Sequence, residues 1–493
     1  MKKRIKKHHI LIILSCVLVY LAIILFYNLG VQSFWIDEGY STYTSKDMVL
    51  NWFYKNRYFL FNWLQALFLK YGWFTDFWAR FSSVITQIIS IILMYLIPVK
   101  LTKNKYVGLI SAIVFWFLYW EIAWWREARF YSLLQCLFLW WIASLTYRVE
   151  NKKVMYLNLA ILLAGLGILF HPFMYCLCAV ILFSVIQQYK KAWDFKTLFS
   201  KKYLSFWCLV VLWLVGLIVY CMKYWMLGKS LTGSILWDKP LYFIPHYFIA
   251  YVQHIWGELW ILSILWVLWM IWLLIKKKWK ESVLFFFPFL LFVYALNVKW
   301  YLIHFRYALL ILPLLIVVAS IFSYDIFKLI KNKTIKGVCV FIVLIGVLIT
   351  TRFQFLPKTY YSLDFTSPQP NFKAAYASIP DWENVISWFP TLCEWYYWDR
   401  GNCVRAIRVD LIHDWDVEEL VNAEEESYTK IPYMKTLDDL DDWIYYFVID
   451  NLTTKSNEIN NKLYKQLKEY WTTRYESWKS YNNILVSILG VEE

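Results

Sequence analysis

The 493-residue chain is 60% hydrophobic and 21% aromatic, carries a net charge of +15 and has a mean hydropathy of +0.46. This composition predicts a polytopic membrane protein with a smaller soluble part attached. Residues 1–355 hold a net charge of +25, whereas residues 356–493 hold −10. Because the positive charge lies mainly in short loops beside apolar segments, it indicates contact with anionic lipid and excludes a nucleic-acid footprint.

Apolar segments of about 17 to 22 residues, each long enough to cross a bilayer core of about 30 Å, recur as far as residue 355. We expect eleven membrane spans, the first of them uncleaved because no small-residue cleavage site follows its apolar run. The spans cover residues 10–29, 77–98, 106–122, 130–147, 154–170, 173–188, 204–222, 256–275, 283–298, 307–325 and 337–355.

Lys and Arg concentrate in alternate connections between these spans. Loops of this kind face the cytoplasm according to the positive-inside rule. We therefore expect a multi-pass protein of the plasma membrane with a cytoplasmic N-terminus, and the odd number of spans places residues 356–493 outside. The basic segments are residues 2–7, 100–105, 148–153, 190–202, 276–280 and 328–336.

The first outer loop, residues 30–76, begins with two adjacent carboxylates, Asp37 and Glu38. Acidic residues are scarce in the membrane part of the chain, and a pair of them at the membrane surface is costly to desolvate. The pair therefore indicates chemistry. The structural alternative is a polar loop entrance in which Asp37 or Glu38 caps a short helix from Gly39.

Residues 58–72 form an apolar, aromatic-rich segment. If this short segment crossed the membrane, every later basic loop would change sides and contradict the charge pattern. We therefore expect a helix that lies in the membrane interface beneath the acidic pair. Lys55 and Arg57 at its start either face a lipid phosphate or extend along apolar surface toward water.

A second concentration of charge lies at the next outer connection, which contains Glu121, Arg126, Glu127 and Arg129. A structural ion pair of Glu127 with Arg126 or Arg129 is one explanation. Arg129 also opens the next span, where a guanidinium at headgroup depth suits bidentate contact with a phosphate.

Arg306 lies where a later outer loop re-enters the membrane. Together with Arg57 and Arg129 it offers a cation at the depth of the acidic pair, as needed to hold an anionic lipid headgroup, although each side chain could simply extend toward water.

His171 closes the fifth span, where a lone histidine is more often a capping residue than a ligand. The outer loop 223–255 lacks the spacing of a known metal site, so no cofactor is predicted and a divalent metal is a minor alternative.

Residues 356–493 are rich in acids and prolines and contain no spanning segment. We expect strands at residues 384–389, 443–449 and 478–489, and an amphipathic helix at residues 459–471. Cys393 and Cys403 suit a disulfide in an oxidising exterior, with two free thiols as the alternative. The predicted fold class is an α-helical polytopic membrane protein with a C-terminal extracytoplasmic α/β domain.

Four motifs follow one another along residues 10–325. They are Trp35-Ile36-Asp37-Glu38 with Tyr40, the segment Tyr58–Gly72 with Ala79-Arg80-Phe81, Glu127-Ala128-Arg129-Phe130-Tyr131, and Arg306-Tyr307 before Pro313. In this order the chain resembles the C-type glycosyltransferase superfamily, in particular the protein-mannosyltransferase and aminoarabinose-transferase-like enzymes. It departs from that pattern where Asn56-Arg57-Tyr58 replaces the usual Pro-Pro.

The resemblance implies that a sugar is transferred from a polyprenyl-phosphate carrier to an acceptor at the outer membrane face, with inversion. It implies that Asp37 is the base and that Glu38 orients the acceptor or Asp37. Polyprenyl phosphate is a good leaving group once cations hold its charge. We expect carrier contacts from Arg129, Arg306, Arg57 and Lys55, and a substrate pocket from Trp35, Tyr40, Glu127, Tyr131, His171 and Tyr307.

Two other classes of function compete with this one. A flippase or polymerase of lipid-linked glycans would use the same cations without Asp37 as base, and a charged groove through the bundle would favour it. A receptor or scaffold would act through its acidic outer domain and would hardly need eleven spans. The expected partners are a polyprenyl-phosphate-linked sugar, the lipid bilayer and an acceptor (protein, lipid or cell-wall glycan), with no nucleic acid.

Overall fold

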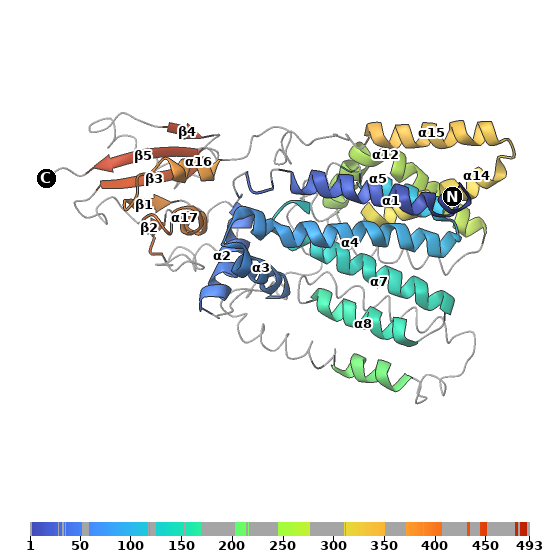
Figure 1. The fold of residues 1–493 in the computed structure, drawn as a ribbon, viewed down its shortest axis with the longest axis horizontal. Coiled ribbons are helices and arrows are strands. Elements are labelled where there is room, and N and C mark those ends of the chain that lie inside the picture. The colour runs from blue at the N-terminus through green and yellow to red at the C-terminus, as the bar shows by residue number, and fades with distance from the viewer. Residues whose placement is uncertain are drawn as a thin grey trace.

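The computed structural model is mostly helical and ends in a small mixed β-sheet (Figure 1). It describes residues 2–27, 29–31, 34, 36–51, 59–116, 118, 125–151, 154–168, 203–212, 215, 245–276, 310, 312–350, 371–387, 389–406, 431–433, 444–450, 479–481 and 484–490. The predicted spans at residues 173–188 and 283–298 and the predicted helix at residues 459–471 lie outside these residues.

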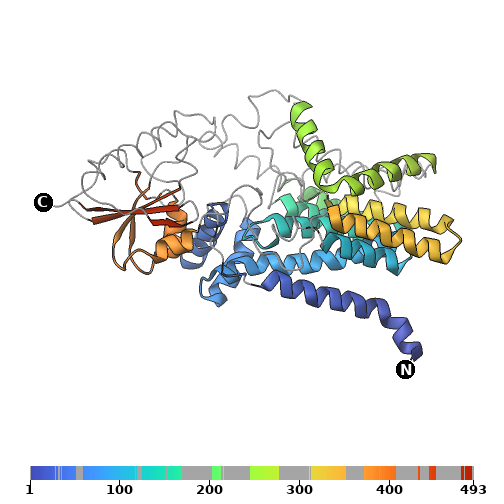
Figure 2. The ribbon, with the colours of Figure 1, turned by 90° about the horizontal axis from the view of Figure 1, so that it is seen from above.

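The long helices of the described chain lie side by side in a bundle (Figures 1 and 2). They are α1 (Lys2–Phe26), α4 (Asp76–Thr102), α5 (Lys105–Trp116), α7 (Tyr131–Asn151), α8 (Val154–Ile168), α12 (Pro245–Ile275), α14 (Leu312–Leu329) and α15 (Lys333–Thr350). Among the described residues, α4 and α14 are long and apolar enough to cross a membrane, and each of the other six contains a shorter apolar helix.

Eight of the predicted spans overlap these helices, and the span expected at residues 204–222 is described only in part, at residues 204–212 and 215. The span expected at residues 106–122 corresponds to α5, which ends at Trp116. Leu118 is no longer helical, and its N–H bonds to the carbonyl of Phe115 three residues back. The described helix therefore covers the first part of this predicted span, and residues 119–122 lie outside the described residues.

Helix α4 lies at the centre of the bundle, in contact with α1, α3, α5, α7 and α14. Gly108 permits the close approach of α5, because a Cβ atom there would lie 2.4 Å from the carbonyl oxygen of Tyr95. The Gln87 amide of α4 donates to Gln135 Oε1 of α7 at 3.0 Å, and Trp125 Nε1 donates to the same oxygen at 3.1 Å. Small residues and buried hydrogen bonds are typical contacts between membrane helices.

Two shorter helices, α2 (Ile36–Asn51) and α3 (Phe59–Gly72), pack against each other between the bundle and the sheet, at the end opposite the N-terminus (Figure 1). Helix α3 agrees with the helix expected at residues 58–72. The alternative of a short helix from Gly39 is wrong, because α2 begins at Ile36 and places both acids in its first turn. Acidic residues are favoured there by the positive end of the helix dipole.

The sheet has the strand order β2-β1-β3-β5-β4, in which β1 is parallel to β2 and β3 while β5 is antiparallel to β3 and β4. The strands are β1 (Asn384–Ser387), β2 (Asn402–Ala406), β3 (Ile444–Asp450), β4 (Lys479–Tyr481) and β5 (Ile484–Gly490). Strands β1 and β3 confirm two predicted strands. The single strand expected at residues 478–489 is wrong, since Tyr481 pairs with Ile484 and the chain reverses between β4 and β5.

Two short helices, α16 (Phe372–Ala377) and α17 (Pro390–Tyr396), lie beside the sheet, and α17 packs on α2 (Figures 1 and 2). We call α16, α17 and β1–β5 together the C-terminal unit. Its hydrophobic core is continuous with the end of the bundle, because Phe34, Ala79 and Ala128 are buried in the same cluster as Leu392 and Trp395. The structure also contains the Cys393–Cys403 disulfide, which decides the alternative left open by the sequence.

Candidate active site at the end of the helix bundle

Glu38, in the first turn of α2, is the centre of a buried ion pair. Its carboxylate accepts hydrogen bonds from Arg80 Nε and Nη2 of α4, each at 2.9 Å, and from the backbone N–H of Ala128 at 2.7 Å. The Glu38 and Arg80 side chains are both 0% exposed. One carboxylate thus joins three segments that lie far apart in the sequence, with the bidentate geometry that makes such pairs strong.

Arg80 is held on its other side as well. Its Nη1 donates to the carbonyl oxygen of Leu29 at 2.9 Å, and its guanidinium lies 4.8 Å from the centre of the Phe34 ring. Arg80 therefore connects the segment before α2 to the first turn of that helix. The sequence motifs include Arg80, but its pairing with Glu38 was not predicted. A charged residue inside an apolar span is nevertheless by itself a signal of function.

Arg129 lies against α2 one turn beyond the acidic pair. Its Nη1 donates to Ser41 Oγ at 2.9 Å, and its backbone carbonyl accepts from Ser83 Oγ of α4 at 3.2 Å. Residues four apart on a helix lie on the same face, so Ser41 shares a face of α2 with position 37. The fold thus brings a predicted carrier-binding cation to the helix that carries Asp37.

Arg126 is directed toward a different part of the bundle. Its Nη1 donates to the carbonyl oxygens of Ile24 and Leu25 at 2.7 and 2.9 Å, and its Nη2 donates to that of Tyr27 at 2.6 Å. These carbonyls end helix α1, where a cation also faces the negative end of the helix dipole. Arg126 therefore caps α1, and the ion pair of Glu127 with Arg126 or Arg129 stays a prediction.

The other described pocket candidates lie around this point. Glu127 is fully buried, and its carbonyl oxygen accepts the Arg129 N–H at 2.8 Å in a tight turn. Tyr131 is buried at the start of α7 with its ring 4.4 Å from that of Phe130. Tyr40 follows the acidic pair on α2 and is partly exposed.

Several predicted site residues fall outside the part of the chain that the structure describes. For Asp37 only the helical backbone position is described. The remaining ones are Trp35, Lys55, Arg57, His171, Arg306 and Tyr307. Within the described ranges, His, Cys, Asp and Glu residues form no group of three that could hold a metal ion.

Comparisons with known proteins identify the fold. Neither a protein-family model nor a curated protein sequence matches the chain. The crystal structure of ArnT from Cupriavidus metallidurans bound to undecaprenyl phosphate matches with a TM-score of 0.59 at 9% identity, over 98% of each chain. The apo structure of that protein matches with a TM-score of 0.58 at 10% identity, over 97% of each chain.

A third match has a much lower structural similarity. The oligosaccharyltransferase AglB from Archaeoglobus fulgidus gives a TM-score of 0.46 at 11% identity, over 80% of this chain and 64% of that chain. Because the sequence identity between this chain and ArnT is only 9–10%, the structural similarity establishes the fold alone. The chain therefore has the fold of ArnT over nearly its whole length.

Proposed function

We propose that the protein is an integral membrane glycosyltransferase that moves a sugar from a polyprenyl-phosphate carrier to an acceptor at the outer membrane face. Residues 356–493 would then lie outside the cell and the N-terminus in the cytoplasm. The observation that carries the proposal is the meeting of α2, α4 and the turn before α7 at Glu38, which places Arg129 beside the helix that bears Asp37. The ArnT fold over nearly the whole chain agrees with it.

In the proposed reaction, Asp37 accepts the proton of the acceptor hydroxyl while that oxygen bonds to the anomeric carbon of the sugar. The bond from this carbon to the carrier phosphate breaks on the opposite face, so the configuration inverts and polyprenyl phosphate leaves with its electron pair. Arg129 would stabilise the phosphate charge, together with the predicted contacts of Arg306, Arg57 and Lys55. Fixed cations of this kind remove the need for a strong general acid.

The geometry suggests a narrower role for Glu38 than orienting the acceptor. Its carboxylate already accepts hydrogen bonds from Arg80 and Ala128, and it is fully buried. We therefore propose Glu38 as a positioning residue that holds the first turn of α2 against α4. Arg80 belongs to the same positioning pair.

The test is sugar transfer by purified protein in liposomes, with polyprenyl-phosphate-linked sugars as donors and a crude envelope fraction as acceptor. Asp37→Asn should retain donor binding and lower turnover about 10²- to 10⁴-fold, the usual contribution of a positioned base. Asp47→Asn removes a carboxylate near the other end of α2 and is the matched control, with turnover as in the wild type.

Release of free polyprenyl phosphate by the wild type and by Asp47→Asn, but not by Asp37→Asn, supports the mechanism. Equal turnover by Asp37→Asn would show that this carboxylate is not the base. Movement of an intact donor across the bilayer without release of polyprenyl phosphate would instead favour the flippase alternative.

A further inference from the structure

Helix α17 of the C-terminal unit lies directly on the first turns of α2. A Cβ atom added to Gly39 would lie 2.6 Å from Leu392 Cδ2, 2.9 Å from Leu392 Cγ and 3.4 Å from Thr391 Oγ1. Real Cβ atoms essentially never come within 3.0 Å of another atom, as both Leu392 distances would require, so the glycine permits this packing. Gly39 is the neighbour of Glu38, and α17 therefore packs next to the buried ion pair that anchors α2.

The end of α17 also holds the segment that leads into α2. The backbone N–H of Phe34 donates to the hydroxyl of Tyr396 at 2.6 Å, and the Phe34 ring lies 5.3 Å from that of Trp395. Trp395 Nε1 and Lys373 Nζ both donate to Asp76, at 2.8 and 3.0 Å. Asp76 begins α4, so the C-terminal unit contacts the same two helices that Glu38 and Arg80 join.

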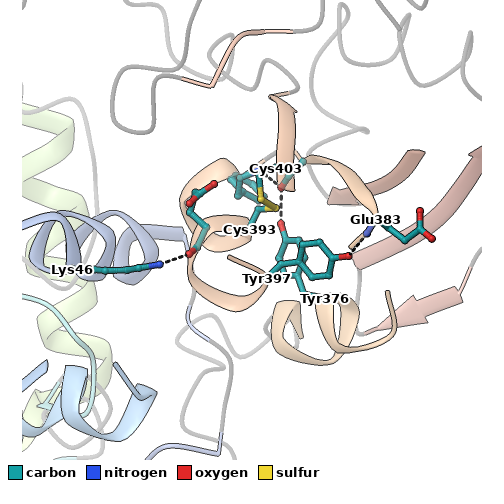
Figure 3. The surroundings of a disulfide bond; sticks show 9 residues. Lys46, Tyr376, Glu383, Cys393, Tyr397 and Cys403 are labelled. Carbon is teal, nitrogen blue, oxygen red and sulfur yellow. Dashed lines mark hydrogen bonds between the residues drawn. A yellow bond between two sulfur atoms is a disulfide. The ribbon is translucent and has the colours of Figure 1, made fainter. Parts of the chain in front are cut away.

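A third contact lies farther along α2. Lys46 Nζ donates to the carbonyl oxygen of Glu394 at 2.8 Å and lies 3.9 Å from the centre of the Trp398 ring (Figure 3). The Lys46 side chain is buried, and the carboxylates of Glu394 and Asp399 attract its charge. The contacts at Phe34, Gly39 and Lys46 thus follow α2 from two residues before its start to Lys46.

Helix α17 is fixed to the rest of the C-terminal unit. Cys393 is fully buried and forms the disulfide with Cys403 of β2, as Figure 3 shows. The Tyr397 hydroxyl accepts the N–H of Glu383 at 3.1 Å and donates to the carbonyl of Pro380. A helix tied covalently to the sheet in this way presents a firm surface to α2.

We propose that α17 is a positioning element for the transfer reaction, and that the contact of Leu392 with Gly39 sets the place of the first turn of α2. The inference rests on the proposed function, since the consequence for catalysis follows only if Asp37 is the base. Displacement of a reacting group by about 1 Å can cost about 10²-fold in rate. Leu392 touches no reacting atom in this scheme and acts through α2.

The test uses Gly39→Ala, Leu392→Ala and the double variant, each in the full-length protein. Alanine is a better helix former than glycine by about 1 kcal/mol, so any loss in Gly39→Ala arises from its contact with Leu392. Gly337→Ala is the matched control, because within the described part of the chain a Cβ atom at that position in α15 has no atom within 4 Å apart from its chain neighbours and the backbone of its own helix.

We expect Gly39→Ala to lower kcat about 10²-fold with an unchanged KM for the donor, and the double variant to recover most of that loss. Hydrogen exchange of the α2 amides should be faster in Gly39→Ala and return to the wild-type rate in the double variant. If the contact were purely structural, Gly39→Ala would lower the thermal stability but would not lower kcat at an unchanged KM.

Wild-type kcat in Gly39→Ala, or a double variant as impaired as the single one, would overturn the proposal. If the wild type transfers no sugar at all, the proposed function fails, and the exchange rates still decide the positioning role. Unchanged α2 exchange in Gly39→Ala would then reject that role, and restoration by the double variant would support it.

Discussion

Replacement of Glu38 by Gln is expected to lower the free energy of unfolding by about 3–5 kcal/mol, the usual cost of removing one partner of a buried ion pair. Glu38 and Arg80 are both 0% exposed. Glutamine keeps the size of the side chain and one acceptor oxygen, but it leaves the Arg80 charge buried without its counter-charge. Arginine does not relieve this cost by losing its proton.

An exposed pair in the same protein provides the control. The Asp381 and Arg400 side chains form a salt bridge and are 59% and 31% exposed. Arg400 also donates to the carbonyl oxygens of Tyr376 and Ile379, and these bonds remain in Asp381→Asn. We therefore expect Asp381→Asn to cost less than about 1 kcal/mol.

The assay is unfolding of the purified proteins in mixed micelles by titration with sodium dodecyl sulfate at pH 7, followed by tryptophan fluorescence. A double variant, Glu38→Leu with Arg80→Met, removes both buried charges and should recover part of the loss, because no uncompensated charge remains. If Glu38→Gln costs no more than Asp381→Asn, the ion pair does not hold α2 to α4 and the reasoning is refuted.

Two further predictions concern the contact between α2 and the C-terminal unit. Burial lowers the pKa of Lys46 from 10.5 to about 8 against the attraction of Glu394 and Asp399, so between these pH values the unfolded chain binds a proton that the folded protein has released. Wild-type stability should thus rise relative to Lys46→Met by about 3 kcal/mol from pH 7 to pH 10.5, and a constant difference between their unfolding free energies would contradict this. Reduction of the Cys393–Cys403 disulfide, whose cysteines are separated by 10 positions, should lower the free energy of unfolding by about 3 kcal/mol. Dithiothreitol should therefore lower the unfolding midpoint of the wild type but not that of a variant with both cysteines replaced by alanine. An unchanged wild-type midpoint would contradict this stabilising role of the disulfide.

Much of the helical framework was predictable from the sequence, because apolar length and side-chain periodicity are local properties. The apolar runs of α4, α7 and α14 predict helices directly, and α3 is helical as expected, while its place in the membrane interface stays a prediction. The alternation of basic loops predicts an orientation in the membrane that stays a prediction. Local signals were less successful where one run contained two elements, as at β4 and β5.

The composition of the candidate site was partly predictable. The chain shows an acidic pair, a Glu-Ala-Arg turn and scattered cations, and the resemblance assigns these residues to one site. Their actual partners were not predictable, because the buried carboxylate of Glu38 pairs with Arg80 forty-two positions away, and no local pattern distinguishes that partner from Arg126 or Arg129.

The sequence by itself thus determined which segments are apolar helices, where the scarce charges lie and which superfamily the motifs resemble. Only the tertiary structure decided that Arg126 caps α1, that Arg129 reaches Ser41, and that α17 packs on Gly39. The physical reason is that helices follow from interactions within a few residues, whereas a buried charge takes the partner that the packed fold brings to it.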